Sequence, residues 1–325
     1  MLGFWVNVVH IFILTRKPLR RHGVNVLMTG IAVNEVIVLV YYLIEQLSNL
    51  KDECSPPLSY SKILIKQILS GARDAARRNV TLLTTLLALI RFLVIHFSRQ
   101  NKFEYLASVS FSTRTMTLVI LISAILTSIF YGQSRIEIYD MWTPDEECSS
   151  IYPTNFTLPL YNVYQSTWLM TDLSIPQDTF IALSATIQTI ASILLPILTL
   201  CLVFSIRSFR KIALQSVANR KQDLKTTKLV TLVTFLFVLN QTPTGISILV
   251  TSSPSTPLGF SLLFPYLINI LTFLFVVNTT TNLIVCLLMS TQYRQVCKSM
   301  LLTIKSRALK TIKTLPGKRL ESVTK

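Results

Sequence analysis

Four charged residues interrupt an otherwise apolar segment at 63–95: Arg73, Asp74, Arg77 and Arg78. On a helix, residues four apart share a face, so we expect Asp74 to pair with Arg78 and to leave Arg73 and Arg77 as a positive face. That face fits one of two roles. It binds an anionic or carboxylate-bearing ligand through guanidinium contacts, or its side chains extend to a polar interface. Polar residues of later segments complete the candidate ligand-binding set: Gln188, Gln241 and Tyr266.

A single carboxylic acid, Glu35, lies midway along another apolar segment, and amides lie in the first and last segments at Asn7, Asn278 and Asn282. An ionisable group at the centre of a membrane helix costs about 2.5 to 3.5 kcal/mol, so it usually faces other helices. We expect these four residues to satisfy one another in a buried cluster. The cluster is either a functional switch or cation site, or a polar contact that only holds helices together.

These polar residues are set in a chain dominated by apolar segments. Of its 325 residues, 51% are hydrophobic and 14% charged, and the mean hydropathy is +0.53. Soluble proteins carry about 25% charged residues, so an ordinary soluble enzyme is excluded. A membrane-spanning helix needs about 20 residues. Seven segments are candidates: 2–14, 24–44, 63–95, 115–132, 179–205, 229–250 and 260–289. We therefore expect an all-α membrane protein, a seven-transmembrane helix bundle.

The first candidate span has only 13 residues. It would form about 20 Å of helix against about 30 Å of hydrocarbon. We therefore expect a first span truncated at its N-terminus. Arg16 and Lys17 follow this apolar run instead of preceding it, which argues against a signal peptide.

Basic residues gather in alternate connecting segments. The segments 15–23, 96–114, 206–228 and 290–325 together hold 23 Lys and Arg and three acids, whereas 45–62, 133–178 and 251–259 hold three basic residues and ten acids. Because positive loops stay cytoplasmic, we expect a plasma-membrane protein with an extracellular N-terminus and a cytoplasmic C-terminus. The net charge of +16 then also favours contact with anionic inner-leaflet lipid. Nucleic acid is not an expected partner, because the basic residues lie between apolar runs.

The segment 133–178 is long, acidic and aromatic, which is typical of a functional or disordered loop. Cys148 within it and Cys54 before the third span lie on the predicted oxidising side, so we expect a disulfide between them; the alternative is two free thiols. Asn155 begins a glycosylation sequon on the same side. The five cysteines lack metal-binding spacing, and neither a metal nor a cofactor is implied.

Apolar residues recur at helical spacing after Met289, through about Lys305, which predicts a short amphipathic helix at the cytoplasmic membrane surface. Cys297 in this stretch is a candidate for palmitoylation. We therefore expect a membrane domain over 1–305 and a basic cytoplasmic tail over 306–325. Two prolines lie deep in the fifth and sixth spans, Pro196 and Pro243, where each frees a backbone carbonyl and predicts a kink.

Several features taken together resemble rhodopsin-like G-protein-coupled receptors. They are the seven spans, the extracellular N-terminus, the loop disulfide, Arg91 at the cytoplasmic end of the third span, and these two prolines. Local strings resemble the nematode serpentine chemoreceptor class W family over most of the chain. They are Leu14–Arg20 (LTRKPLR), Asn25–Ala32 (NVLMTGIA), Arg77–Arg78, Ala88–Arg91 (ALIR), Lys225–Val230 (KTTKLV), Pro243–Ile246 (PTGI) and Met289–Arg294 (MSTQYR).

The resemblance matches Asn7 to the family's helix-one Asn and implies switch and G-protein-coupling roles for five positions: Glu35, Arg91, Pro243, Asn282 and Tyr293. Asn278 joins this switch set as a member of the polar cluster. The chain also departs from the receptor pattern. Glu35 replaces the commoner Asp, Ile90 replaces the acid before Arg91, and Gln241 stands where a Trp is common. The helix-seven motif lacks its Pro and Tyr after Asn282. Sodium binding at Glu35 is therefore an open question.

Asp223 is the only acid of the 206–228 segment and lies 20 residues before Pro243. Some rhodopsin-like receptors carry an acid there that faces the helix-three arginine. We expect either a resting-state contact between Asp223 and Arg91 or a solvated loop charge.

The resemblance implies a receptor that binds an extracellular ligand and activates a heterotrimeric G protein. The ligand is a peptide or a small chemosensory molecule: the acidic loop suits a basic peptide, and Arg73 and Arg77 suit a carboxylate. A transporter is the alternative, although eight Gly and no visible repeat disfavour it. A truncated receptor without signalling activity is a further alternative. No selectivity sequence indicates a channel, and three scattered His indicate no enzyme.

Overall fold

The computed structural model describes most of the chain. The described residues are 2–48, 54–97, 101–144, 148, 151–153, 156–165, 177–212, 242–247, 250, 258–289 and 291–314. Within them, long helices dominate, and a two-stranded sheet lies between α4 and α5. The helices are α1 (Leu2–Leu14), α2 (Gly23–Ser48), α3 (Tyr60–His96), α4 (Val109–Gly132), α5 (Gln177–Ile212), α7 (Leu258–Met289) and α8 (Thr291–Thr314), with a 3-10 helix η1 (Asn101–Ala107) before α4.

Five of these helices, α2, α3, α4, α5 and α7, are long and apolar enough to cross a membrane, and α1 is a shorter apolar helix. Most of the predicted sixth span, 229–250, lies outside the described residues, although 242–247 is helical. The structure therefore shows a multi-span helical bundle, and the count of seven stays a prediction.

Helix α4 shows why the bundle belongs in lipid. Its buried residues are small and polar, Ser112, Ser123 and Thr127, whereas large apolar side chains such as Leu118 and Ile125 are more than half exposed. A soluble protein buries its apolar side chains, because water makes their exposure unfavourable. The reverse arrangement fits a helix that meets hydrocarbon on one side and its neighbours on the other.

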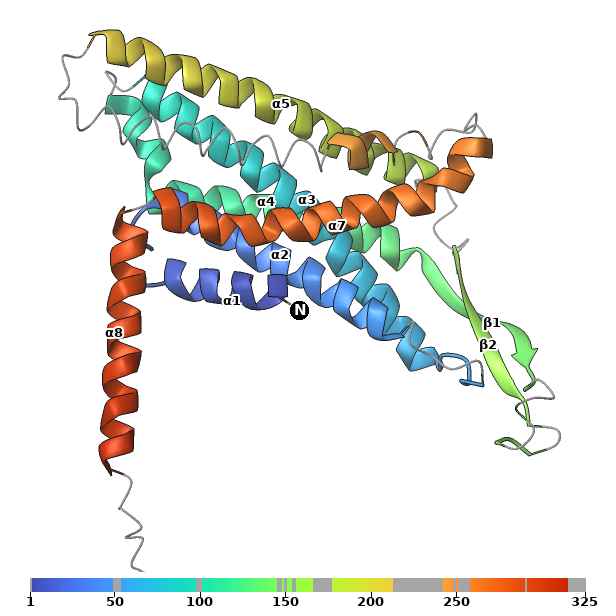
Figure 1. The fold of residues 1–325 in the computed structure, drawn as a ribbon. Helices are drawn as coiled ribbons and strands as arrows, with labels where there is room; N and C mark the ends of the chain where they lie inside the picture. The colour runs from blue at the N-terminus through green and yellow to red at the C-terminus, as the bar shows by residue number, and fades with distance from the viewer. Residues whose placement is uncertain are drawn as a thin grey trace, which may run out of the picture.

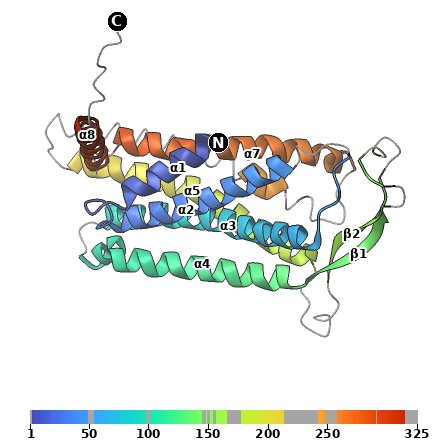
Figure 2. The ribbon, with the colours of Figure 1, turned by 90° about the horizontal axis from the view of Figure 1, so that it is seen from below.

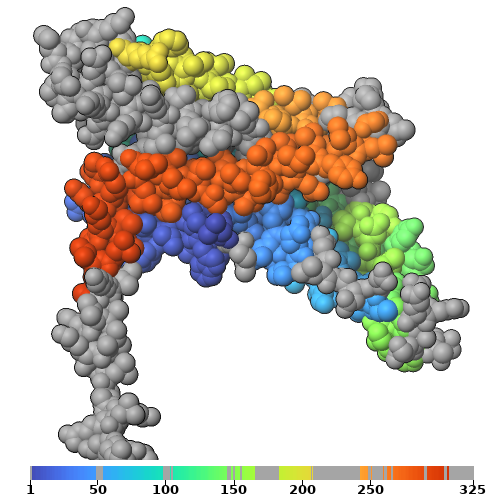
Figure 3. All heavy atoms as spheres, in the orientation of Figure 1, coloured from blue at the N-terminus to red at the C-terminus, as the bar shows by residue number. Residues whose placement is uncertain are grey.

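Helix α3 lies at the centre of the bundle and packs against α2, α4 and α5. Figures 1 and 2 show these helices running side by side, with α1 and α7 completing the bundle. Buried apolar side chains of α2, α3 and α5 form its main core: Leu27, Ile31, Val80, Leu83, Ile90 and Leu195. Figure 3 shows α7 as a band across one face, with α1 and α2 beneath it.

The hairpin lies at one end of the bundle and α8 begins at the other (Figure 1). The end with the two strands is called the hairpin end, and the opposite end, where α8 begins, is called the α8 end (Figure 1). Helix α8 runs across the direction of the other helices and continues to Thr314, past the expected limit near Lys305. Nine residues of the expected tail are therefore helical.

The expectation of an all-α protein is wrong in one segment. Strands β1 (Ser134–Trp142) and β2 (Leu158–Gln165) form an antiparallel hairpin within the predicted loop 133–178, with an irregularity between Ile138 and Asp140. The alternating Arg-Ile-Glu-Ile-Tyr pattern of β1 is the signal for a strand. Gln67 of α3 donates to the Ser134 hydroxyl at 3.2 Å, which ties the hairpin to the bundle.

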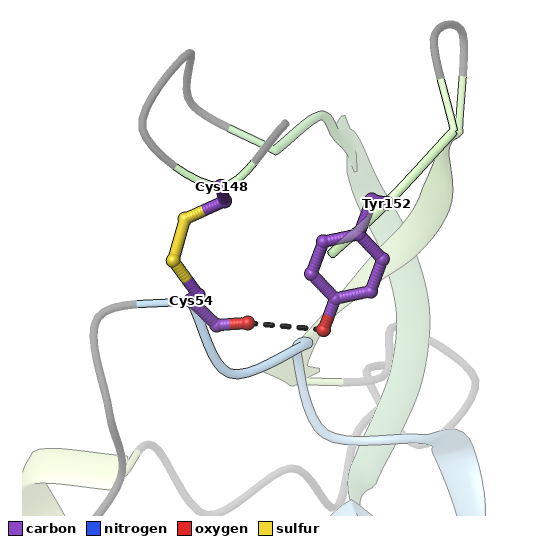
Figure 4. The surroundings of a disulfide bond; sticks show 3 residues. All are labelled: Cys54, Cys148 and Tyr152. Atoms are coloured by element: carbon purple, nitrogen blue, oxygen red, sulfur yellow. Dashed lines mark hydrogen bonds between the residues drawn. A yellow bond between two sulfur atoms is a disulfide. The ribbon is translucent and has the colours of Figure 1, made fainter. Parts of the chain in front are cut away.

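The predicted disulfide between Cys54 and Cys148 is confirmed, with a Cα–Cα distance of 5.6 Å. Figure 4 shows Tyr152 beside it, donating from its hydroxyl to the Cys54 carbonyl oxygen at 3.0 Å. Tyr152 also stacks on Phe156 and meets the edge of Trp142. The disulfide and this aromatic cluster connect the hairpin segment to the start of α3.

We predict that replacing Cys54 with Ser, or reducing the disulfide, lowers the stability of the detergent-solubilised chain. The bond closes a loop of 94 residues, and loss of a native disulfide costs about 2 to 5 kcal/mol. Thermal unfolding of Cys54→Ser, Cys148→Ser and the double variant measures the effect, and the three should agree. Cys201→Ser, which removes a free thiol, is the control. Equal stability of Cys54→Ser and the control would refute the prediction.

Candidate functional site

An ion pair organises the charged residues of α3 near the hairpin end. Both Arg73 Nη2 and Nε lie 2.8 Å from Asp74 Oδ1, and the Tyr131 hydroxyl of α4 donates to Asp74 Oδ2 at 2.6 Å. Both oxygens of this carboxylate are therefore engaged. The expected Asp74–Arg78 pair is wrong: Tyr131 orients the carboxylate from α4, and Arg73 folds over to meet it.

Arg73 also contacts α2. Its guanidinium lies 4.4 Å from the centre of the Tyr41 ring, a cation–π arrangement that holds a positive charge where water is scarce. The Tyr41 hydroxyl donates to Glu45 at 3.3 Å and accepts from Ser70 at 3.4 Å. Arg73 is thus held between an acid and a tyrosine and is not a free positive group, contrary to expectation.

Arg77 lies where α2, α3 and α7 meet. Its Nη1 donates to the Tyr42 hydroxyl of α2 at 3.3 Å, and its guanidinium lies 5.7 Å from the centre of the Phe275 ring of α7. Thr272 of α7 donates to the same Tyr42 hydroxyl at 3.5 Å. Among the described residues, the buried Arg77 Nε has no acceptor. Arg77 therefore keeps a donor for a further negatively charged group.

The other predicted ligand contacts are distributed differently. Gln188 of α5 is buried, which agrees with a position inside the bundle. Tyr266 of α7 is 70% exposed, so the described part of the bundle does not enclose it. Gln241 lies outside the described residues. The structure therefore brings together the α3 charges with tyrosines of α2 and α4, which the sequence did not indicate as a group.

The predicted polar cluster of the spans forms in part. Glu35 of α2 is 1% exposed, and its Oε1 accepts from Asn282 Nδ2 of α7 at 2.8 Å. Asn7 and Asn278 are also buried, but Asn7 donates to the Gly3 carbonyl of its own helix. Three buried acceptors of this cluster have no donor among the described residues: Glu35 Oε2, Asn7 Oδ1 and Asn278 Oδ1. The bond between α2 and α7 is the part of the cluster that the structure shows.

A second amide pair was missed by the sequence analysis. Asn79 Nδ2 of α3 donates to Asn34 Oδ1 of α2 at 3.0 Å, and Asn34 Nδ2 donates to the Gly30 carbonyl. Both residues are at most 5% exposed. The sequence could have indicated them if every amide in a predicted span, as well as Glu35, had been expected to need a polar partner. Asn34 precedes Glu35 on α2, so the contact that joins α2 to α3 lies next to the bond that joins α2 to α7.

At the α8 end, His10 and Tyr293 form a buried contact that spans the chain. His10 Nδ1 lies 2.8 Å from the Tyr293 hydroxyl, and each residue is 1% exposed. Burial raises the pKa of Tyr293 above its usual value, so the phenol stays neutral. This bond fixes the start of α8 against α1. Tyr293 was expected at a switch position, but His10 was not.

A comparison with protein-family models matches residues 1–303 to the serpentine type 7TM GPCR chemoreceptor Srw model. The chain belongs to the Srw chemoreceptor family. The predicted class W resemblance is thereby confirmed. None of the curated proteins compared with the chain matches it.

Two of the predicted inner switch positions of this Srw receptor, Arg91 of α3 and Pro243, lie among the described residues. Pro243 lies in the helical stretch 242–247, and a Cβ on Gly245 would come 3.4 Å from Thr189 Cα of α5, so the stretch packs closely on α5. Asp223 and Asn155 lie outside the described residues, so their roles stay predictions. Cys297 is partly exposed.

The Glu35–Asn282 bond generates a stability prediction for this Srw receptor. Asn282→Ala removes the donor and leaves a buried carboxylate oxygen without a partner, so we expect a loss of about 0.6 to 2 kcal/mol, the range of polar contacts between membrane helices. Glu35→Gln keeps a carbonyl oxygen that accepts from Asn282 and should lose less. Unfolding in mixed detergent–SDS micelles measures both variants. A loss for Asn282→Ala no larger than the loss for Glu35→Gln would contradict the prediction.

Proposed function

We propose that the chain is a plasma-membrane receptor that binds a carboxylate-bearing extracellular ligand near the hairpin end and activates a heterotrimeric G protein at the α8 end. Membership of a GPCR chemoreceptor family supports the receptor role. The charge distribution supports the orientation, because the segments near the α8 end hold most of the basic residues. In this orientation the disulfide lies on the oxidising side.

The observation that carries the ligand site is the environment of Arg77. Arg73 is satisfied by Asp74, but the buried Arg77 Nε has no acceptor among the described residues. Among the described residues, Arg77 meets two neutral groups, the Tyr42 hydroxyl and the Phe275 ring. A ligand carboxylate would supply both the missing acceptor and the missing negative charge. A peptide terminus and a small organic acid both offer this group.

The same contacts supply a route for coupling. Arg77 touches α2 and α7, so a carboxylate that draws the guanidinium toward itself weakens contacts that join those helices to α3. Farther along, the bond from Asn282 to Glu35 joins α7 to α2. A ligand that binds better to one arrangement of these helices shifts the population toward it. The opening that admits the G protein involves Arg91, Tyr293, Pro243 and the 206–228 segment with Asp223.

A ligand screen tests the function. Cells expressing the chain are exposed to peptides with free carboxyl termini, to their amidated counterparts and to small organic acids, with G-protein dissociation as the readout. We expect an agonist that bears a carboxylate. Arg91→Ala should abolish the response while surface expression and ligand binding persist. Ligand-dependent solute movement across vesicles without a G protein would instead indicate a transporter.

The contribution of Arg77 is measured with the same agonist. Arg77→Gln should lower its potency by about tenfold to a hundredfold, because a hydrogen bond to a charged group contributes about 1.5 to 3 kcal/mol. Amidating the ligand should cost potency on the unmodified receptor but not on Arg77→Gln. Lys66→Gln, which removes an exposed charge from the same helix, is the matched control. Equal losses for Arg77→Gln and Lys66→Gln would contradict the assignment.

A further inference from the structure

The connection between α1 and α2 packs directly against the beginning of α8. Leu19, in the middle of this connection, is 1% exposed and belongs to a buried cluster with Tyr293 and Val296 of α8. Its carbonyl oxygen accepts from Asn25 Nδ2 at 2.8 Å. The His10–Tyr293 contact holds α1 against the same turn of α8. Two segments more than 270 residues apart therefore form one surface at the α8 end.

This surface is strongly basic. Around the buried Leu19 and Tyr293, every basic residue is exposed: Arg16, Lys17, Arg20, Arg21, Arg294 and Lys298. These six residues are called the two-segment basic patch. Neither 15–22 nor 291–314 contains an Asp or Glu. The Arg73–Asp74 ion pair lies away from this surface, toward the hairpin end of α3. The patch is thus a concentration of positive charge without an internal counterion.

Neighbouring apolar side chains place the patch at the level of lipid headgroups. The Arg16 guanidinium lies 4.1 Å from the centre of the Phe12 ring, and Phe12 is 51% exposed on the last turn of α1. On α8, Leu301 and Leu302 are more than 60% exposed beside Lys298. Such pairing of exposed apolar and basic side chains is typical of a membrane interface. Because α8 runs across the spanning helices (Figure 1), it lies along the plane of that interface.

We propose that the two-segment basic patch binds a multiply phosphorylated headgroup of an inner-leaflet lipid. This proposal uses the orientation given above but not the ligand or the G protein. Three arginines of the connection and one of α8 offer planar forks that pair with phosphate oxygens in a bidentate way. A headgroup with several phosphates can engage both segments at once, whereas a singly charged headgroup meets only the general attraction of basic residues. The bound lipid would clamp the α1–α2 connection to α8.

Binding of short-chain phosphatidylinositol 4,5-bisphosphate to the purified full chain in detergent tests the proposal, with native mass spectrometry counting bound lipid. Short-chain phosphatidylserine and free inositol trisphosphate are measured in parallel. We expect the bisphosphate lipid to bind at least about tenfold more tightly than either. Removing one segment's charges, as Arg16→Gln with Arg20→Gln or as Arg294→Gln with Lys298→Gln, should each weaken binding about tenfold, as expected for two lost charge-assisted contacts.

Two control variants keep the test decisive. Lys310→Gln with Lys313→Gln removes the same charge from the far end of α8 and should leave binding within about twofold, because lost general attraction alone is small. Arg16→Lys with Arg20→Lys keeps the charge but removes the planar forks, so it should bind more weakly than the unmodified chain and more tightly than the Arg16→Gln, Arg20→Gln variant, with unchanged thermal unfolding as the check on folding. Equal weakening by the Lys310 and Lys313 changes would overturn the proposal. Tight binding of free inositol trisphosphate, or equal binding of phosphatidylserine, would overturn it as well.

Discussion

The hydrocarbon of a membrane offers no hydrogen-bonding partner, so each polar side chain in a spanning helix must find one on another helix or on its own backbone. This constraint explains most of the specific contacts in the bundle. Hydroxyls such as Thr81, Thr84 and Thr199 donate to carbonyls of their own helices. Groups that cannot be satisfied locally join two helices instead. Many large apolar side chains, which can face lipid without cost, lie on the outside, as on α4.

Helix α3 makes polar contacts with neighbouring helices along the whole length of the bundle. Near the hairpin end its charges meet tyrosines of α2 and α4, at mid-length Asn79 meets Asn34, and Thr85 donates to the Ala191 carbonyl of α5 at 3.2 Å. At the α8 end, His96 lies 3.2 Å from the Ser205 hydroxyl. A rearrangement of any of these contacts changes how α3 sits against its neighbours. A helix connected in this way suits a receptor in which one end must respond to the other.

Patterns of composition and charge predicted the architecture well, because they follow from the membrane itself. The apolar segments, the Cys54–Cys148 pairing and the family are read from local sequence and from loop charge. The bond from Asn282 to Glu35 was also accessible, since a lone acid in a span needs a partner. These features depend on single segments or on the contrast between the two sides of the bundle.

Pairings that depend on how helices rotate about their axes were not predictable from one sequence. The spacing of Asp74 and Arg78 allowed an ion pair, but Tyr131 of α4 draws the carboxylate toward Arg73. His10 and Tyr293 are separated by 283 positions and meet only because α8 crosses α1. The hairpin lies in the segment 133–178, which we expected to be a loop because of its length, although the alternating residues of β1 indicated a strand. For Asp74, a third helix decides which partner is chosen.

The claim on which the account depends most is that the hairpin end faces outside the cell and the α8 end faces the cytoplasm. Single cysteines at two exposed positions, Tyr139→Cys on β1 and Ser306→Cys on α8, test it in a background where the free Cys201, Cys286 and Cys297 are replaced by Ser. With a membrane-impermeant maleimide, the account predicts labelling of the β1 position in intact cells and of the α8 position only after permeabilisation. Labelling of the α8 position in intact cells would contradict it.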